Sequence, residues 1–185
     1  MSTVLIPLAE GCEELEAVTL IDLLRRAEIT VITASLSDTL LVTASRGVRL
    51  MADTSLESVI YDDFDMIILP GGMPGTTHLN EDPHIHAILK RLHSSGKVIA
   101  AICAAPLVLA NAGLLSGKTV SCYPEVLNSN EWPEIKLVDD AVVIDDLILT
   151  SRGPGTAMDF ALEIIEYLKD EHTRSIVESA LVRSK

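Results

Sequence analysis

The sequence predicts one α/β domain over residues 1–185, in which helices cover both faces of a mainly parallel β-sheet and a small β-hairpin lies beside it. Strand and helix signals alternate along the chain, which is typical of sheets built from strand–helix–strand units. The chain shows no internal repeat, linker or low-complexity segment, and its 185 residues are ample for a buried core. These observations favour a single domain.

The first three elements follow from the spacing of apolar residues. Val4–Leu8 is a short apolar run that predicts a buried strand. Glu13–Arg26 carries apolar residues at helical spacing and predicts a helix. The β-branched run Thr30–Ser35 predicts the second strand.

A hairpin and another buried strand come next. Leu40–Thr43 and Val48–Met51 predict two strands that are joined across Ser45–Gly47. Met66–Leu69 is wholly apolar and ends at Pro70–Gly72, residues that stop a strand. We expect Met66–Leu69 to be buried.

One strand leads directly into a cysteine. Pro83–Ser94 predicts a helix, and Val98–Ile102 predicts a buried parallel strand. Cys103 follows, and Ala104–Ala112 predicts a helix that ends at Gly113. The Cys103 sulfur would then lie beside the free N–H groups of a helix start, which favour a thiolate over a thiol.

The remaining elements complete the alternation of strands and helices. Short apolar or β-branched runs predict four further strands at Thr119–Cys122, Lys136–Val138, Val142–Ile144 and Leu147–Thr150. Two helices are expected to close the chain, at Thr156–Leu168 and Thr173–Val182.

Composition excludes several classes of function. A net charge of −13 argues against a nucleic-acid partner and against an anionic membrane surface. No apolar run approaches the roughly 20 residues that span a bilayer, and the N-terminus is typical of a first strand rather than a secretory signal. Cys12, Cys103 and Cys122 form no paired framework, so we expect a reducing, cytoplasmic setting.

Three loops with unusual chemistry follow predicted strand ends. They are Gly11–Glu16, Pro70–Gly72 and Cys103–Pro106. Ligands of open parallel sheets bind at the carboxyl ends of the strands. We therefore expect these loops to form one site.

Cys103 is the predicted nucleophile, because nucleophile elbows share its strand-to-helix turn. The alternative is a small buried core residue. We interpret Cys122 as a packing residue. Cys12 lies on a loop near the expected site, where it either packs or serves as a second accessible thiol.

Three glutamates open the first predicted helix. Glu13 and Glu14 are explained by the helix dipole, because negative charges are favourable at the start of a helix. Glu16 lies among apolar residues and would point toward the sheet end, unless it too is a surface residue. Burial there raises the pKa of a carboxyl group, which could then exchange a proton with the cysteine sulfur.

Two further segments offer hydrogen-bond donors. Gly71 and Gly72 either form a simple turn or aim their N–H groups at an oxyanion. Arg152 lies in Thr150–Thr156, a segment that either cradles an anion or caps a helix. Arg46, in the hairpin turn, is a second candidate cation or a solvated side chain.

The histidines offer neither a metal site nor a base. His84 and His86 are two residues apart at a helix start and do not share a helix face. No other histidine neighbours Cys103 in sequence. Because serine-hydrolase, phosphate-loop and dinucleotide-binding signatures are also missing, we expect no metal and no cofactor.

In combination, these segments resemble the DJ-1/ThiJ/PfpI superfamily, and specifically its DJ-1 branch. The resemblance covers essentially the whole chain. It rests on five motifs in a fixed order: Glu13–Glu16, Ser45–Arg46, Leu69–Gly72, Ala100–Pro106 and Leu149–Thr156.

The resemblance implies a flavodoxin-like three-layer sandwich that forms homodimers. It further implies that Cys103 is an oxidation-sensitive reactive cysteine and Glu16 its protonated carboxyl partner. Backbone donors around the sulfur would come from Gly71, Gly72 and Ala104. An anion site close to the dimer interface would be lined by Arg46 and Arg152.

One residue departs from the family pattern. Many members of this branch carry a histidine near the cysteine, where this chain has Tyr123 ahead of Pro124. A neutral phenol with a pKa near 10 is a poor general base at neutral pH. The departure therefore argues against a protease that uses a Cys–His pair.

The resemblance implies two main functions. The leading hypothesis is cysteine-dependent handling of reactive α-oxoaldehydes, as a glutathione-independent glyoxalase or a deglycase, with a small aldehyde or a glycated protein as partner. The alternative is a non-enzymatic redox sensor or chaperone, in which Cys103 oxidises to a sulfinate held by Glu16. A cysteine protease is a third hypothesis.

Overall fold

The computed structural model describes residues 2–183 and confirms the α/β fold. Within them a seven-stranded sheet has the order β10-β11-β7-β6-β1-β2-β5. Every neighbouring pair is parallel except β10 and β11, so β10 is an antiparallel edge strand. The strands span Thr3–Leu8 (β1), Thr30–Ser35 (β2), Thr54–Ser55 (β5), Met66–Leu69 (β6), Val98–Ile102 (β7), Val142–Asp145 (β10) and Ile148–Ser151 (β11).

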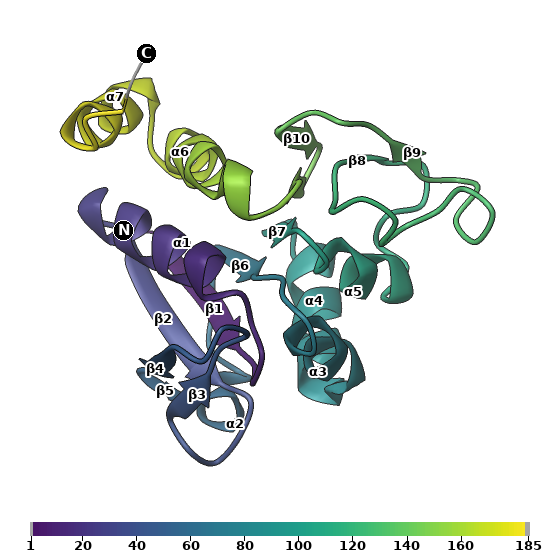
Figure 1. Cartoon of the computed structure of the whole chain (residues 1–185), viewed down its shortest axis with the longest axis horizontal. Coiled ribbons are helices and arrows are strands. Elements are labelled where there is room, and N and C mark those ends of the chain that lie inside the picture. The colour runs from purple at the N-terminus through teal and green to yellow at the C-terminus, as the bar shows by residue number, and fades with distance from the viewer. Residues whose placement is uncertain (1, 184–185) are drawn as a thin grey trace.

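Helices cover both faces of the sheet and complete three layers (Figure 1). One face packs against α1, α6 and α7, which span Glu14–Arg26, Ala157–Leu168 and Glu171–Ala180. The other face packs against α2, α3, α4 and α5, which span Leu56–Val59, Gly75–Glu81, Pro83–Ser94 and Pro106–Asn111. Strands β6 and β7 are apolar throughout, as expected for strands with both faces buried.

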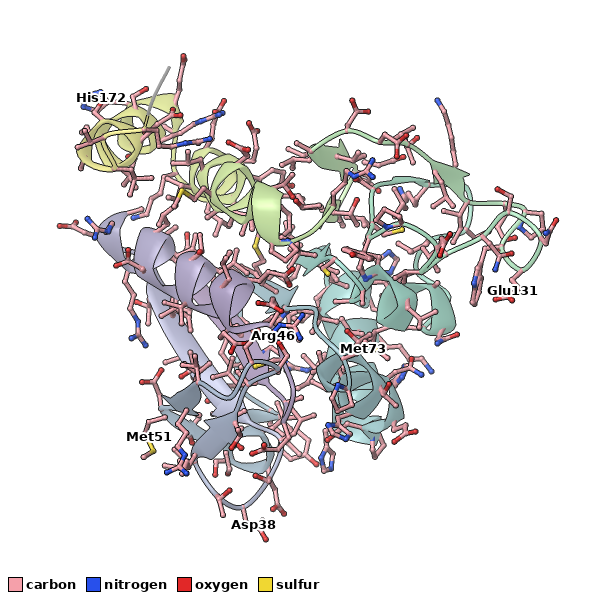
Figure 2. All side chains as sticks on the ribbon, viewed as in Figure 1. Asp38, Arg46, Met51, Met73, Glu131 and His172 are labelled. Atoms are coloured by element: carbon pink, nitrogen blue, oxygen red, sulfur yellow. The ribbon has the colours of Figure 1, made fainter. Side chains whose placement is uncertain are left out.

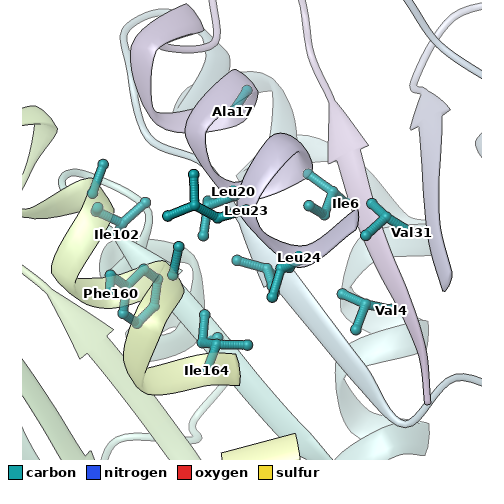
Figure 3. Close-up of a cluster of buried hydrophobic side chains, with 14 of the residues drawn as sticks. Val4, Ile6, Ala17, Leu20, Leu23, Leu24, Val31, Ile102, Phe160 and Ile164 are labelled. Atoms are coloured by element: carbon teal, nitrogen blue, oxygen red, sulfur yellow. The ribbon is translucent and has the colours of Figure 1, made fainter. Parts of the chain in front are cut away.

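The alternation of side chains in β1 divides the core in two. Val4 and Ile6 face the layer of α1 and α6, whereas Leu5 faces the layer of α4. On α1, Leu20 and Leu24 are fully buried against the first of these faces, beside β1 (Figure 3). Burial of each leucine contributes roughly 1.5–3 kcal/mol and fixes the orientation of α1 over the sheet.

The structure corrects several predicted boundaries. The helix after Cys103 begins at Pro106 rather than at Ala104, because Cys103 has a positive φ of 64° and the next two residues form a turn. The last long helix begins at Ala157, after a 3₁₀ turn η1 at Pro154–Thr156. The short elements β5, α2 and α3 were not predicted.

Two small sheets stand apart from the main one. The predicted hairpin is confirmed as antiparallel β3 and β4, at Leu41–Thr43 and Arg49–Met51. Strands β8 (Thr119–Val120) and β9 (Lys136–Leu137) form a separate parallel pair. No helix within residues 2–183 is long and apolar enough to cross a membrane.

Candidate active site

The three loops singled out by the sequence meet at the carboxyl ends of β1, β6 and β7. A backbone hydrogen bond joins the first two loops, since the Glu13 N–H donates to the Gly71 carbonyl at 2.8 Å, and Gly71 packs closely against Cys103 of the third loop. The backbone of Cys103 is held on both sides, since its N–H donates to the Ser151 carbonyl at 3.0 Å and its carbonyl accepts from the Tyr123 N–H at 2.8 Å. The cysteine is therefore fixed by the main chain of two other segments.

The turn at Cys103 has a strained backbone. Its φ of 64° lies in the left-handed region, which costs a residue with a side chain on the order of 1–3 kcal/mol. A glycine is required beside it: a Cβ on Gly71 would lie 2.6 Å from the Cys103 Cβ. Cys103 is 8% exposed and borders a cavity, as a nucleophile elbow requires.

Glu16 is fully buried next to this thiol. Its Oε2 accepts a hydrogen bond of 2.8 Å from the Gly71 N–H, and the carboxyl group also contacts the Cys103 thiol. Burial raises the pKa of Glu16 from 4.5 to about 7, although both of these contacts lower it. Such a carboxyl group carries a proton for much of the time at neutral pH and can exchange it with its surroundings.

The acidity of Cys103 depends on its carboxyl neighbour. Burial comes first, followed by the charge and the close approach of the Glu16 carboxyl group, and together they raise the pKa of the thiol to about 12. The N–H groups of Gly72 and Ala104 lower the pKa, as expected from the sequence, but they are outweighed. Protonation of Glu16 removes its negative charge and therefore lowers the pKa of the Cys103 thiol.

The structure corrects the assignment of one backbone donor. The Gly71 N–H donates to Glu16 rather than to the sulfur, so it orients the Glu16 carboxyl group. Gly72 and Ala104 remain as the donors that face the sulfur. Gly72 has a φ of 90°, and a Cβ there would lie 2.4 Å from the Glu13 nitrogen, so only glycine fits this position.

Glu14 has a role that the sequence reasoning missed. Its carboxylate accepts hydrogen bonds from the Ser45 hydroxyl at 3.0 Å and from the Arg46 N–H at 2.9 Å, and this fastens the hairpin turn to α1. Burial would raise the pKa of Glu14, but these bonds outweigh it and lower the pKa. The positions of Glu13–Glu14 and Ser45–Arg46 along the sequence do not predict this contact.

A cavity of about 340 Å³ opens above the thiol. Arg46 lines it from the hairpin turn, and Met73 lines it from the loop after β6; both are labelled near the middle of Figure 2. The Arg46 guanidinium has no carboxylate within 4 Å in the part of the chain that the structure describes. Arg152 does not line this cavity, because its guanidinium pairs with the Asp139 carboxylate.

Comparison with known proteins identifies the chain. The model of the DJ-1/PfpI family matches residues 2–167. The chain belongs to the DJ-1/PfpI family. Protein dj-1beta of Drosophila melanogaster is 42% identical over 183 residues, which cover 96% of each chain. Glutathione-independent glyoxalase DJR-1.2 of Caenorhabditis elegans is 41% identical over 170 residues, which cover 91% of this chain and 90% of the relative.

Solved structures of this DJ-1/PfpI family superpose over the whole chain. The crystal structure of Drosophila melanogaster DJ-1beta matches with a TM-score of 0.94 and 41% identity, covering 100% of both chains. Toxoplasma gondii DJ-1, described as oxidized, matches with a TM-score of 0.93 and 37% identity over 100% of both chains. The flavodoxin-like fold expected from the sequence is thus confirmed.

The other cysteines of this family member are placed differently from Cys103. Cys12 is fully buried, and burial together with the charge of Glu14 raises its pKa to about 12. The alternative of a second accessible thiol is therefore wrong. Cys122 packs partly buried against the core, as predicted.

No histidine among residues 2–183 lines the cavity. His78 bonds the Glu10 carbonyl, and His86 bonds the Asn80 carbonyl. Among residues 2–183, no group of three His, Cys, Asp or Glu side chains is arranged to hold a metal ion. Tyr123, the residue that the sequence places ahead of Pro124, lines the cavity.

Proposed function

We propose that this protein converts α-oxoaldehydes to 2-hydroxy acids without glutathione, using Cys103 as the nucleophile and Glu16 as the proton carrier. One observation carries the proposal: a fully buried carboxyl group with a pKa near 7 contacts a thiol that borders a cavity. A group that gains and loses a proton near neutral pH suits a reaction with several proton transfers. A relative at 41% identity that is named a glutathione-independent glyoxalase supports it.

In the first step the Cys103 thiolate adds to the aldehyde carbon, while Glu16 holds the proton. A C–S bond forms, and the electron pair of the C=O double bond moves to oxygen. The N–H groups of Gly72 and Ala104 stabilise this oxyanion. The oxyanion then takes the proton of Glu16, which gives a hemithioacetal and leaves Glu16 ionised.

In the second step ionised Glu16 removes the hydrogen of the former aldehyde carbon as a proton. The electron pair of that C–H bond forms an enediolate with the adjacent ketone carbon. Glu16 returns the proton to the ketone carbon, and the hydroxyl proton of the first carbon passes to the second oxygen. The product is a thioester of a 2-hydroxy acid: one carbon is oxidised and its neighbour reduced, so no external oxidant is needed.

In the last step water cleaves the thioester. A water oxygen bonds to the carbonyl carbon, the C–S bond breaks, and a water proton returns to the Cys103–Glu16 pair. The same addition of Cys103 to a carbonyl carbon would remove early aldehyde adducts from proteins. Because no histidine of the described residues lines the cavity, Glu16 and water carry out the proton transfers.

Steady-state turnover of methylglyoxal tests the proposal. Lactate formation should be abolished in Cys103→Ala and should fall at least about 100-fold in Glu16→Gln, the usual contribution of a proton carrier. Glu57→Gln, an exposed glutamate on α2, is the matched control and should keep full activity. Full activity of Cys103→Ala would refute the proposal.

One observation favours a redox-sensor function as a second candidate. The Glu16 Oε1 is buried and has no hydrogen-bond partner of normal geometry within the described residues. A protonated Oε1 could donate to an oxygen added to the Cys103 sulfur by peroxide. Mass spectrometry after mild peroxide should find two added oxygens on the Cys103 peptide of the wild type and fewer in Glu16→Ala.

We further propose that the protein is a homodimer in the reducing cytoplasm, where Cys103 stays reduced. Leu15 and Val18 on α1 are about half-exposed apolar side chains, and so is Val48, whose N–H donates to the Glu14 carboxylate at the start of α1. Val48→Asp should give monomers in analytical ultracentrifugation. Ile176→Asp, on exposed α7, should not. A monomeric wild type would refute the dimer.

A further inference from the structure

The cavity above Cys103 has both polar and apolar lining residues. The polar ones are Glu13, Ser45 and Arg46. The large apolar ones come from three separate segments: the loop after β6, the segment after β8, and η1. We call this part of the lining the apolar wall; it consists of Met73, Tyr123, Val126 and Pro154.

The apolar wall is open to solvent although its side chains are large. Met73 is 60% exposed and Tyr123 is 50% exposed. Apolar surface gains free energy in proportion to the area that a ligand removes from water. A substrate that covers this wall therefore binds more tightly than one that leaves the wall exposed to water.

The ring of Tyr123 lies within reach of a group attached to the sulfur. A Cβ on Gly153 would be 3.3 Å from the Tyr123 Cδ2 and 3.9 Å from the Cys103 Sγ, so ring and sulfur flank the same backbone position. The floor of the site is closed by Glu16, which is fully buried. A substituent on the bound aldehyde must therefore extend toward the open side, along the apolar wall.

The cavity is also larger than a small aldehyde needs. Its volume of about 340 Å³ corresponds to roughly ten water molecules at about 30 Å³ each. A methyl-substituted oxoaldehyde occupies only part of this space. An aromatic ring in place of the methyl group would reach the wall and displace its water.

We propose that this site prefers α-oxoaldehydes with an aromatic or bulky apolar substituent, and that Tyr123 and Met73 determine this specificity. The proposal rests on the proposed function, whose chemistry it leaves unchanged. In this role the Tyr123 ring supplies apolar area, and its hydroxyl group takes no part.

Turnover of phenylglyoxal to mandelate and of methylglyoxal to lactate tests the preference. The ratio of the two kcat/KM values should fall about tenfold from wild type to Tyr123→Ala, and comparison between variants cancels the intrinsic reactivity of the two aldehydes. Tyr123→Phe should keep the ratio of the wild type. Tyr61→Ala, an 87% exposed tyrosine elsewhere, is the control and should also keep it.

A binding measurement separates this inference from the proposed function. Phenylglyoxylate and pyruvate are inert analogues, and each should slow alkylation of Cys103 by iodoacetamide. Phenylglyoxylate should protect at about tenfold lower concentration in the wild type, and this advantage should vanish in Tyr123→Ala.

The outcomes distinguish the two ideas. Turnover of methylglyoxal with a ratio that Tyr123→Ala leaves unchanged would overturn the preference and keep the proposed function. Selective protection by phenylglyoxylate without turnover of either aldehyde would support the apolar wall and overturn the proposed function. A tenfold loss in Tyr123→Phe would assign the role to the hydroxyl group and overturn the proposal.

Discussion

Replacement of Glu16 by glutamine should stabilise the protein at alkaline pH and have little effect at acid pH. The wild-type carboxyl group has its pKa raised by burial from 4.5 to about 7. Between these values the unfolded chain has lost the proton and the folded chain still holds it, so stability falls as pH rises. Glutamine resembles the protonated form at every pH and carries no such penalty.

The pKa shift gives the size of the effect. From 4.5 to about 7, at 1.36 kcal/mol per pKa unit, ionised Glu16 costs the folded state about 3 kcal/mol at pH 8. At pH 5 the cost is below about 1 kcal/mol, because Glu16 is still protonated when folded. The advantage of Glu16→Gln should therefore grow by about 2–3 kcal/mol between the two pH values.

Urea unfolding of wild type and Glu16→Gln at pH 5 and pH 8 measures this difference. Glu14→Gln is the matched control with the opposite sign, because hydrogen bonds lower the pKa of Glu14 and its stabilisation is lost as pH falls. Glu14→Gln should therefore be less stable than wild type at pH 8. An advantage of Glu16→Gln that is equal at both pH values would refute the reasoning.

Three further predictions follow from the packing around the site. Gly72→Ala should lower the free energy of unfolding, measured by urea titration, by more than about 2 kcal/mol, because the new Cβ would meet the Glu13 nitrogen. Gly96 also has a positive φ but has open space around it, so Gly96→Ala is the control and should lower the free energy of unfolding by less. Iodoacetamide should leave Cys12 unmodified in the folded protein, since it is fully buried; labelling of Cys12 ahead of Cys103 in peptide mapping would contradict this. Glu14→Gln should speed hydrogen exchange at the Arg46 amide, measured by mass spectrometry, because that N–H loses a charged acceptor; an unchanged rate would contradict it.

Much of the fold could be predicted because its signals are local. The central strands are continuous apolar runs, and the two layers of helices follow from apolar spacing along α1, α4 and α6. The short helix α3 was missed because Gly75, Thr76 and Asn80 have low helix propensity and only tertiary contacts hold them. Nothing in the spacing of β8 and β9 showed that they pair with each other outside the main sheet.

The candidate site could also be predicted only in part from the sequence. Cys103 could be found from a strand that ends in a cysteine, and Glu16 from a charged residue among apolar ones. The partner of each polar group could not be found, because it depends on tertiary placement. Thus Gly71 donates to Glu16, Asp139 holds Arg152, and burial reverses the expected acidity of the thiol.

The backbone contacts of Cys103 make its amide a probe of the whole molecule. Its N–H donates to the end of β11, its carbonyl accepts from the segment after β8, and Gly71, at the end of β6, leaves no room for a side chain beside its Cβ. Segments that lie far apart in sequence must separate before this amide meets solvent. We therefore expect it to exchange hydrogen only when the central sheet opens, as slowly as the most protected amides of β6 and β7. Small ligands reach the thiol through the cavity without any such opening.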